Sequence, residues 1–574
     1  MRNTKLNYLA ILLAVIFMAG CGGLKKMKKK AGEVQYTVSP SPLEMHADSV
    51  ALSISGKYPV KYFGRKATLE LTPVLKYEGG ESQFQMVKIQ GEKVPENNTV
   101  IKYKEGGGFS YTHKIPFVDG MRISDLEVRI VGKQKSKVVP FDPMVIGKGV
   151  IATPALVKID PRPIVGKDKF QRITSEVVEG DIAYNLQQST PKSGENNGAD
   201  IKNLKSLIDE SQKNERLVIK GVNVDGKASW DGNIDEINKP LADKRAKNAN
   251  EFVLNFLFKK IEKVKEQGFV SAKTTDEDWA GFEAALKAST LPDKDVILNV
   301  LKMHSDLEVR ERELKKLATV YLELKKDVLP QQRRSVIGLN IDHVGHSDEE
   351  LNMLFDTNPD SLKAEEILYT ATLTKDANRK LKVYQFYAKK FSNDWRGHNN
   401  VGMAYIMLNK VSDAKSAFEE ARKLDDKNTI IQNNLGVVSL MEGNVPDAET
   451  KFKSASGAGN EVNYNLGIVN IKKANYEAAV GFFGSECTFN GALALVLNGK
   501  QDEAIKKIDC AENNDQAIMY YLKAVAGARK GDSDVMFNNL RAAVSKDASF
   551  AEKAKKDMEF FKFFGDDTFK SIVK

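Results

Sequence analysis

Histidine, cysteine and tryptophan are scarce in this chain, which has six, three and three of them among 574 residues. Because histidine and cysteine are the usual protein ligands of zinc and other transition metals, their scarcity disfavours a metal enzyme. The sequence also lacks a nucleophile elbow, a His-Glu-x-x-His motif and a phosphate-binding loop. We therefore predict that the protein is not an enzyme and that it carries no metal and no cofactor.

Long apolar runs are nearly absent, and the one exception lies at residues 9–18. This run is shorter than the roughly 20 residues that span a bilayer. Arg2 and Lys5 precede the run, and Ala19-Gly20-Cys21 follows it. A basic start, a short apolar run and small residues before a cut are the pattern of a secretory signal peptide, which we assign to residues 1–20.

The end of this signal resembles the lipobox of bacterial lipoproteins, which closes with Ala-Gly-Cys. In that family the cysteine becomes the first residue of the mature chain and carries fatty acids such as palmitate. The resemblance therefore implies lipidation at Cys21, followed by a lysine-rich tether over residues 21–35. Gly22 stands where an inner-membrane retention signal would carry aspartate. The resemblance thus also implies an outer-membrane protein that is anchored by lipid and faces the periplasm.

Residues 36–165 contain short segments in which apolar and polar side chains alternate, at 50–54, 68–72 and 126–130. A period of two residues is typical of strands that bury one face. Glycine and asparagine pairs between these segments supply turns. We predict one or two β-sandwich modules here, without a catalytic cluster.

Residues 170–345 alternate strand and helix patterns. We predict strands at 181–186, 216–222 and 335–341, with helices at 199–212 and 241–258 between them. This β-α-β-α-β order favours two layers, with the helices packed on one sheet. A further helical insert of about 274–329 precedes the last strand.

One stretch of this region contains the pattern Gly226-Lys227-Ala228-Ser229, Gly232, Asn238, Leu241-Ala242 and Arg245-Ala246, and Arg333-Arg334-Ser335-Val336 lies at the last strand. These motifs resemble the OmpA C-terminal domain, a family that binds peptidoglycan. In the family an aspartate and an arginine hold the diamino acid of the stem peptide by charge. Here Ser229 stands at the aspartate position, Asp231 follows two residues later and Arg245 is retained. The resemblance implies these three as peptidoglycan-binding candidates, while a purely structural role of Arg245 stays open.

Residues 361–574 are helical and self-similar. Asn400-Val401-Gly402, Asn434-Leu435-Gly436 and Asn465-Leu466-Gly467 recur at spacings of 34 and 31 residues. A period near 34 predicts a solenoid of helix pairs, in which small residues allow the paired helices to approach closely.

The repeats resemble tetratricopeptide (TPR) repeats at Trp395, Gly402, Tyr405, Ala414 and Phe418. The resemblance implies a concave face that binds protein segments. An alternative is that several of its asparagines only bond neighbouring backbone. The partner-binding candidates are Asn399, Tyr405, Asn433, Asn463 and Tyr464.

Two cysteines, Cys487 and Cys510, remain besides Cys21. They flank two helices predicted at 489–498 and 501–511, and in an antiparallel pair these two positions come close together. A disulfide suits an oxidising compartment, and two small packing residues are the alternative.

Taken as a whole, the chain is multidomain α+β and resembles outer-membrane lipoproteins with OmpA-like domains and TPR repeats from anaerobic Gram-negative bacteria, some of them immunoreactive antigens. The first hypothesis is a scaffold that binds protein partners and contacts the wall or a neighbouring protein. A peptidoglycan-binding wall anchor and an accessory subunit of a secretion or outer-membrane assembly machine are the alternatives. Acidic residues separate the basic ones along the helices, so nucleic acid is not an expected partner.

Overall fold

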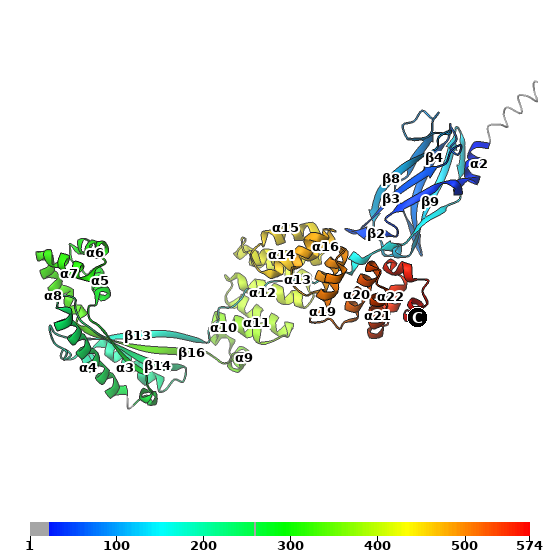
Figure 1. The fold of residues 1–574 in the computed structure, drawn as a ribbon. Coiled ribbons are helices and arrows are strands. Elements are labelled where there is room, and N and C mark those ends of the chain that lie inside the picture. The colour runs from blue at the N-terminus through cyan, green and yellow to red at the C-terminus, as the bar shows by residue number, and fades with distance from the viewer. Residues whose placement is uncertain (1–21, 258–259) are drawn as a thin grey trace, which may run out of the picture. The chain divides into compact units, whose positions relative to one another are not determined.

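A computed structural model describes residues 22–257 and 260–574, which form two compact units (Figure 1). Unit 1 combines the chain up to Lys167 with Lys375–Lys574, and unit 2 is Asp168–Thr374. The predicted signal peptide and Cys21 lie outside the described residues. Within the described part of the chain, every helix is too short or too polar to cross a bilayer.

The N-terminal part of unit 1 is strand-rich, as predicted, and we call its two sheets the sandwich. One sheet has the order β1-β3-β2-β12, with β8 also paired to β3. The other has the order β10-β9-β4-β6-β7, with β11 on β9 and β5 on β4. The predicted alternating segments fall on β3, β4 and β9, whose inward side chains share one apolar core. The strands are β1 (Gln35–Ser39), β2 (Leu43–His46), β3 (Ser49–Tyr58), β4 (Thr68–Tyr77), β5 (Gly80–Gln83), β6 (Val87–Gly91), β7 (Thr99–Ile101), β8 (Gly107–Pro116), β9 (Ser124–Gln134), β10 (Lys137–Pro140), β11 (Met144–Lys148) and β12 (Val150–Ile151).

The residues predicted to be a tether begin with a helix, α2 (Gly22–Lys29), that packs on the sandwich. Its apolar side chains Leu24 and Met27 are 4% and 1% exposed. The hydroxyl of Tyr62 donates to the carbonyl of Met27 at 2.9 Å. The first part of the predicted lysine-rich tether is therefore a helix with a buried face, because two apolar residues lie one helical turn apart on α2.

The chain leaves the sandwich at β12 and continues through a short 3-10 helix, η3 (Thr153–Leu156). The sequence predicts that the β-rich region extends to residue 165, but residues 157–166 lie extended along the C-terminal helices. Near the start of this stretch the Thr153 hydroxyl donates to Glu559, which also pairs with Arg529.

The C-terminal part of unit 1 is the predicted solenoid, in which α12 to α21 form successive antiparallel pairs (Figure 1). Within a pair, a glycine of the first helix faces a phenylalanine of the second, and a Cβ added to the glycine would come within 2.5–2.7 Å of the ring. The three such pairs are Gly402 with Phe418, Gly436 with Phe452, and Gly467 with Phe483. The helices are α11 (Ala377–Lys390), α12 (Trp395–Met407), α13 (Val411–Leu424), α14 (Thr429–Met441), α15 (Val445–Ser454), α16 (Asn460–Lys472), α17 (Tyr476–Phe483), α18 (Phe489–Leu497), α19 (Gln501–Asp509), α20 (Ala517–Lys530), α21 (Ser533–Lys546), α22 (Ser549–Lys555) and α23 (Asp567–Ile572).

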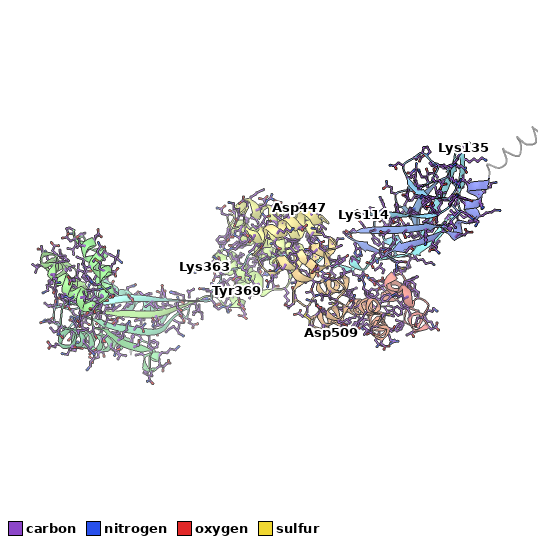
Figure 2. The ribbon with its side chains drawn as sticks, turned by 45° about the horizontal axis from the view of Figure 1, so that its top comes forward. Lys114, Lys135, Lys363, Tyr369, Asp447 and Asp509 are labelled. Carbon is purple, nitrogen blue, oxygen red and sulfur yellow. A yellow bond between two sulfur atoms is a disulfide. The ribbon has the colours of Figure 1, made fainter. Side chains whose placement is uncertain are left out.

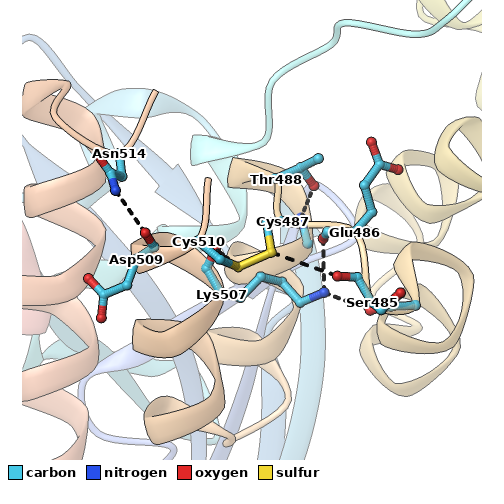
Figure 3. Close-up of a disulfide and its surroundings, with 10 residues drawn as sticks. Ser485, Glu486, Cys487, Thr488, Lys507, Asp509, Cys510 and Asn514 are labelled. Carbon is cyan, nitrogen blue, oxygen red and sulfur yellow. Dashed lines mark hydrogen bonds between the residues drawn. A yellow bond between two sulfur atoms is a disulfide. The ribbon is translucent and has the colours of Figure 1, made fainter. Parts of the chain in front are cut away.

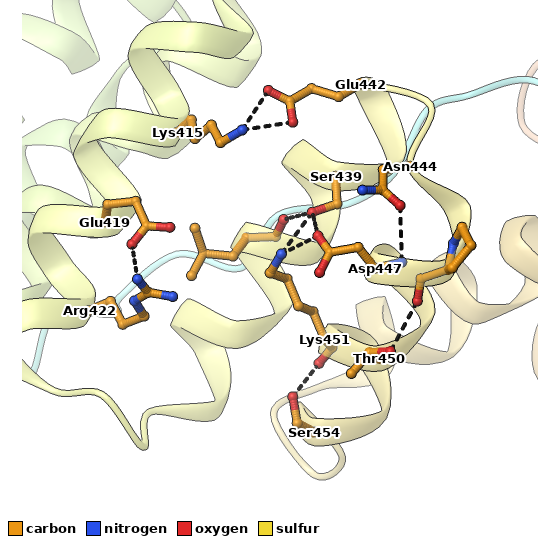
Figure 4. A network of polar contacts seen from close by, with 12 residues as sticks. Lys415, Glu419, Arg422, Ser439, Glu442, Asn444, Asp447, Thr450, Lys451 and Ser454 are labelled. Atoms are coloured by element: carbon orange, nitrogen blue, oxygen red, sulfur yellow. Dashed lines mark hydrogen bonds and ion pairs between the residues drawn. The ribbon is translucent and has the colours of Figure 1, made fainter.

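Polar contacts also join neighbouring helices of the solenoid (Figure 4). Lys415 on α13 pairs with Glu442, just after α14, at 3.0 Å. Ser439 on α14 donates to Asp447 on α15 at 2.5 Å, and Lys451 contacts both of them. These contacts supplement the apolar packing between successive repeats.

Unit 2 is a four-stranded sheet of order β13-β16-β14-β15. Helices α3 and α4 share an apolar core with this sheet. We predicted three strands and missed β15, because most of its side chains are polar and exposed. It pairs in parallel with β14, so the helical insert begins at α5 rather than at 274. The elements are β13 (Ile173–Ala183), α3 (Ala199–Ser211), β14 (Leu217–Lys227), α4 (Lys239–Leu257), β15 (Val270–Thr275), α5 (Trp279–Ala288), α6 (Lys294–Met303), α7 (Leu307–Lys316), α8 (Ala318–Asp327), β16 (Arg334–Val344), α9 (Asp348–Thr357) and α10 (Ala364–Thr370).

Helix α10 belongs to unit 2 although the repeats were predicted to begin at 361. The solenoid therefore starts at α11.

Candidate functional site

Four buried asparagines hold residues 157–166, which we call the bound segment. They come from the first helices of successive pairs, α12, α14, α16 and α18, and each is at most 1% exposed. Each amide oxygen accepts the backbone N–H of one residue of the bound segment, and each amide nitrogen donates to the carbonyl of that same residue. We call these four residues the asparagine ladder. The pairs are Asn400 with Gly166 (2.7 and 2.9 Å), Asn434 with Ile164 (2.7 and 2.7 Å), Asn465 with Arg162 (2.7 and 2.9 Å) and Asn490 with Lys158 (2.9 and 2.9 Å).

Two neighbouring asparagines connect these contacts from one repeat to the next. Asn399 donates to the carbonyl of Ile164 at 3.2 Å and accepts from Asn434 at 2.8 Å. Asn433 donates to the carbonyl of Arg162 at 3.1 Å and accepts from Asn465 at 3.0 Å. The buried amides therefore satisfy one another as well as the bound segment, which removes the cost of burying them.

The sequence of the bound segment suits this pattern. Residues 162, 164 and 166 are bonded through their N–H groups. Pro161 and Pro163, which have no N–H, directly precede residues 162 and 164. A proline also restricts the residue before it to extended conformations, which here concerns Asp160 and Arg162. The segment is thus biased towards the extended shape that the ladder holds.

No ladder asparagine bonds the backbone of Asp160. The solenoid contacts the Asp160 side chain instead. The Asp160 carboxylate accepts from the Tyr464 hydroxyl at 2.8 Å and from the Asn490 amide at 2.9 Å. Burial raises the pKa of Asp160 above its usual value, and it also raises the pKa of Tyr464.

Side chains add a second kind of contact with the bound segment. The guanidinium of Arg162 lies 3.6 Å from the ring centre of Tyr464, and it pairs with Glu486 at 2.5 Å. Ile164 is 6% exposed and is part of the apolar core of the solenoid. The segment is therefore held through its backbone at four residues and also through the side chains of Asp160, Arg162 and Ile164.

Only some of the partner-binding residues predicted from the sequence contact the bound segment. Asn399, Asn433 and Tyr464 contact the bound segment, whereas Asn463 is exposed and the hydroxyl of half-buried Tyr405 accepts from Gln385. The four ladder residues were not among the candidates. The signal for three of them was present, because Asn400, Asn434 and Asn465 open the recurring Asn-x-Gly triplets.

Cys487 and Cys510 are joined by a disulfide, with their Cα atoms 5.7 Å apart (Figure 3). The bridge ties the residues before α18 to the end of α19. Lys507 on α19 donates to the carbonyls of Gly484 and Glu486 at 2.6 and 2.9 Å. These contacts hold the loop that presents the Glu486 carboxylate to the bound segment.

Unit 2 has a separate pocket of about 290 Å³, and it gathers Ser229, Asp231 and Arg245. Ser229 donates to one oxygen of Asp231 at 2.5 Å, and Arg333 lies 3.7 Å from the other. Lys325 also lines the pocket. The carboxylate of Asp231 is therefore already engaged, while three cationic side chains share the site.

Arg245 is 1% exposed and donates to the carbonyls of Gln188 (3.0 Å) and Lys227 (2.7 Å). Burial lowers its pKa to about 10, and burial also lowers the pKa of Arg333. The buried Nε of Arg333 has no hydrogen-bond partner among the residues that the structure describes. With Arg245, Arg333 and Lys325 around one engaged carboxylate, the pocket carries an excess of positive charge.

No protein-family model matches this chain, and no curated protein matches it either. Similar solved structures include YrrB, "a TPR protein with an unusual peptide-binding site" (20% identity, TM-score 0.26, 31% of this chain and 99% of that one). Another is a tetratricopeptide repeat protein from Parabacteroides merdae (14% identity, TM-score 0.28, 43% of this chain and 98% of that one). Both of these are TPR proteins.

Proposed function

We propose that this protein is a non-enzymatic outer-membrane lipoprotein scaffold. Its asparagine ladder binds an extended protein segment through the backbone, and unit 2 contacts the cell wall or a neighbouring protein. The observation that carries the proposal is the ladder itself, in which one amide satisfies both backbone groups of one residue. An asparagine amide offers an acceptor and a donor side by side, so this recognition depends little on the bound side chains.

The ladder is filled by the chain's own segment, so its first action is in cis. The bound segment connects the sandwich to unit 2, and the solenoid grips it over four repeats. Hydrogen bonds of this kind contribute about 1 kcal/mol each after the loss of water is counted. The solenoid therefore fixes the bound segment, which leads from the sandwich to unit 2, through many individually weak hydrogen bonds.

A peptide-binding experiment tests the ladder. Residues 157–166 are replaced by a glycine-serine stretch of equal length, and binding of a labelled peptide of residues 155–167 is measured by fluorescence anisotropy. We expect saturable binding that Asn434→Ala abolishes and that Asn463→Ala, an exposed asparagine nearby, leaves unchanged. Equal binding by both variants, or none by the parent, would contradict the proposal.

Lipid attachment is tested separately in cells that carry the full chain. Incorporation of labelled palmitate into a membrane fraction is expected for the natural sequence and not for Cys21→Ser. Label on the Cys21→Ser variant would contradict the anchor while leaving the ladder untouched.

A second candidate function is a peptidoglycan-binding wall anchor. It is supported by the pocket in which Ser229, Asp231 and Arg245 meet, and by the resemblance of unit 2 to the OmpA-like pattern. Co-sedimentation with purified peptidoglycan tests it with two exposed neighbours on one helix. Lys325→Glu puts a negative charge at the pocket and should reduce binding, whereas Lys326→Glu, outside the pocket, should not. No sedimentation of the natural chain defeats this candidate.

A further inference from the structure

One end of the sandwich collects chain turns from both sheets, and we call it the α2 end. Strand pairing defines it, because Tyr58 at the end of β3 lies opposite Gly107 at the start of β8. In the other sheet, Thr68 at the start of β4 lies opposite Lys133 near the end of β9. The α2 end comprises residues 22–33, 57–67, 92–107 and 132–137.

Three contacts join these four stretches, and the first is the hydrogen bond from the Tyr62 hydroxyl to the Met27 carbonyl at 2.9 Å. Leu24 lies against Gly132, where an added Cβ would be 3.0 Å from its Cδ2. The backbone N–H of Lys61 donates to the carbonyl of Tyr103 at 2.6 Å. Figure 2 shows Lys135 at this end of the sandwich, with Lys114 farther along towards the other end.

Positive charge is concentrated at the α2 end. Its four stretches contain fifteen lysines and arginines against four glutamates. Asp142 and Glu70, which pair with Lys28 and Lys133, raise the acidic count to six and leave a net charge of +9. The whole chain also carries +9, so all the remaining residues together sum to zero.

Helix α2 carries three exposed lysines of this charge on consecutive turns beside the predicted lipid site. Because Leu24 and Met27 face the sandwich, Lys25, Lys26 and Lys29 project away from it and are exposed. None of these three forms an ion pair with a residue that the structure describes. Other basic residues at the α2 end form ion pairs with nearby acidic residues, as Arg65 does with Glu92 at 3.0 Å.

We propose that the α2 end is a lipid-facing surface that lies on anionic phospholipid headgroups. The proposal rests on the lipid anchor of the proposed function, since α2 begins one residue after Cys21 and so leaves no spacer between lipid and helix. Each lysine near an anionic membrane raises the affinity about fivefold, and a polybasic patch adds to a lipid anchor. Because no apolar side chain of α2 is left to insert, the attraction is electrostatic and weakens with salt.

Vesicle co-sedimentation tests this surface without the lipid. The mature chain with Cys21→Ser is mixed with vesicles of phosphatidylcholine, either alone or with one-third phosphatidylglycerol. We expect binding only to the anionic vesicles, and loss of that binding in high salt. Lys25→Gln, Lys26→Gln and Lys29→Gln together should lower the affinity at least tenfold. The matched control changes three exposed solenoid lysines, Lys389, Lys427 and Lys556, to glutamine and should change it less than twofold.

Equal binding to both kinds of vesicle, or an equal loss in the control, would overturn the proposal. Inorganic phosphate replacing chloride at equal ionic strength should not release the protein, and selective release would assign the lysines to free phosphate instead. Thermal unfolding of both triple variants checks that the sandwich is intact. Because this chain carries no lipid, a negative result here is distinct from a negative result in palmitate labelling.

Discussion

The asparagine ladder in unit 1 and the pocket in unit 2 both bury polar side chains, but they satisfy them differently. At the ladder, Asn434 bonds both backbone groups of Ile164 as well as Asn399. In the pocket, the Nε of Arg333 is buried without a partner among the described residues. A buried polar group without a partner costs more than a partnered one contributes. The ladder therefore pairs its buried amides with the chain's own segment, whereas the pocket leaves one buried guanidinium nitrogen unpaired among the described residues.

The largest effect is expected from Asn434→Ala. This change leaves the N–H of buried Ile164 without a partner and removes one of the two donors to its carbonyl, the other being Asn399. It also removes a donor to Asn399. We expect the free energy of unfolding of unit 1 to fall by about 3 to 4 kcal/mol, measured in urea. Asn463→Ala should change it by less than about 0.5 kcal/mol. Equal effects would mean that the ladder does not hold the segment.

Removing the disulfide with Cys487→Ser and Cys510→Ser is expected to have the next largest effect. The bridge closes a sequence separation of 23 residues, and such cross-links contribute about 2 to 3 kcal/mol. The expected result is a lower urea midpoint for unit 1 and faster hydrogen exchange at Lys158. Reducing the natural protein should reproduce the shift, while the double variant should not respond to reductant.

We expect anions to stabilise unit 2, which contains the pocket, and not unit 1, which contains the ladder. Phosphate in place of chloride, at equal ionic strength, is expected to stabilise unit 2 by about 1 kcal/mol when its concentration is several times the dissociation constant. Lys325→Glu should abolish this gain by cancelling part of the positive charge. A gain that survives in Lys325→Glu would place the anion elsewhere.

The smallest effect concerns pH and Asp160. Burial raises its pKa in the folded state above the unfolded value, so its contribution is fully present at low pH and is lost as pH rises through the folded pKa. We expect the natural chain to lose a little stability between acidic and neutral pH. Asp160→Asn, which keeps an acceptor for the Tyr464 hydroxyl, should remove most of that slope. Parallel pH profiles for the two proteins would show that Asp160 carries none of it.

Local patterns predicted the kinds of structure in this chain well. Alternation predicted the strand-rich region, and the recurring Asn-x-Gly triplets predicted the helix pairs. The glycines have a local reason that any repeat of this period shares, since Gly402 faces Phe418 within one pair. The strand β15 escaped prediction because its side chains are mostly polar and exposed, so no alternation marks it.

Only the tertiary structure identified which asparagines bind the segment. Asn433 and Asn434 are adjacent in sequence and differ by about 100° around the helix, yet both are buried and only Asn434 bonds both backbone groups of one residue. The sequence also did not predict that residues 157–166 fill the ladder. Ile164 is separated from Asn434 by 270 residues, and no local pattern connects them.

The amino-acid sequence alone determined the repeat period, the strand alternation and the total charge, because each depends on spacing or composition along the chain. Only the tertiary structure decided that the ladder is filled by residues 157–166 and that four separate stretches bring their lysines to one end of the sandwich. The physical reason is that hydrogen bonds and electrostatic potential depend on distance in space, and folding brings together groups that the chain keeps far apart.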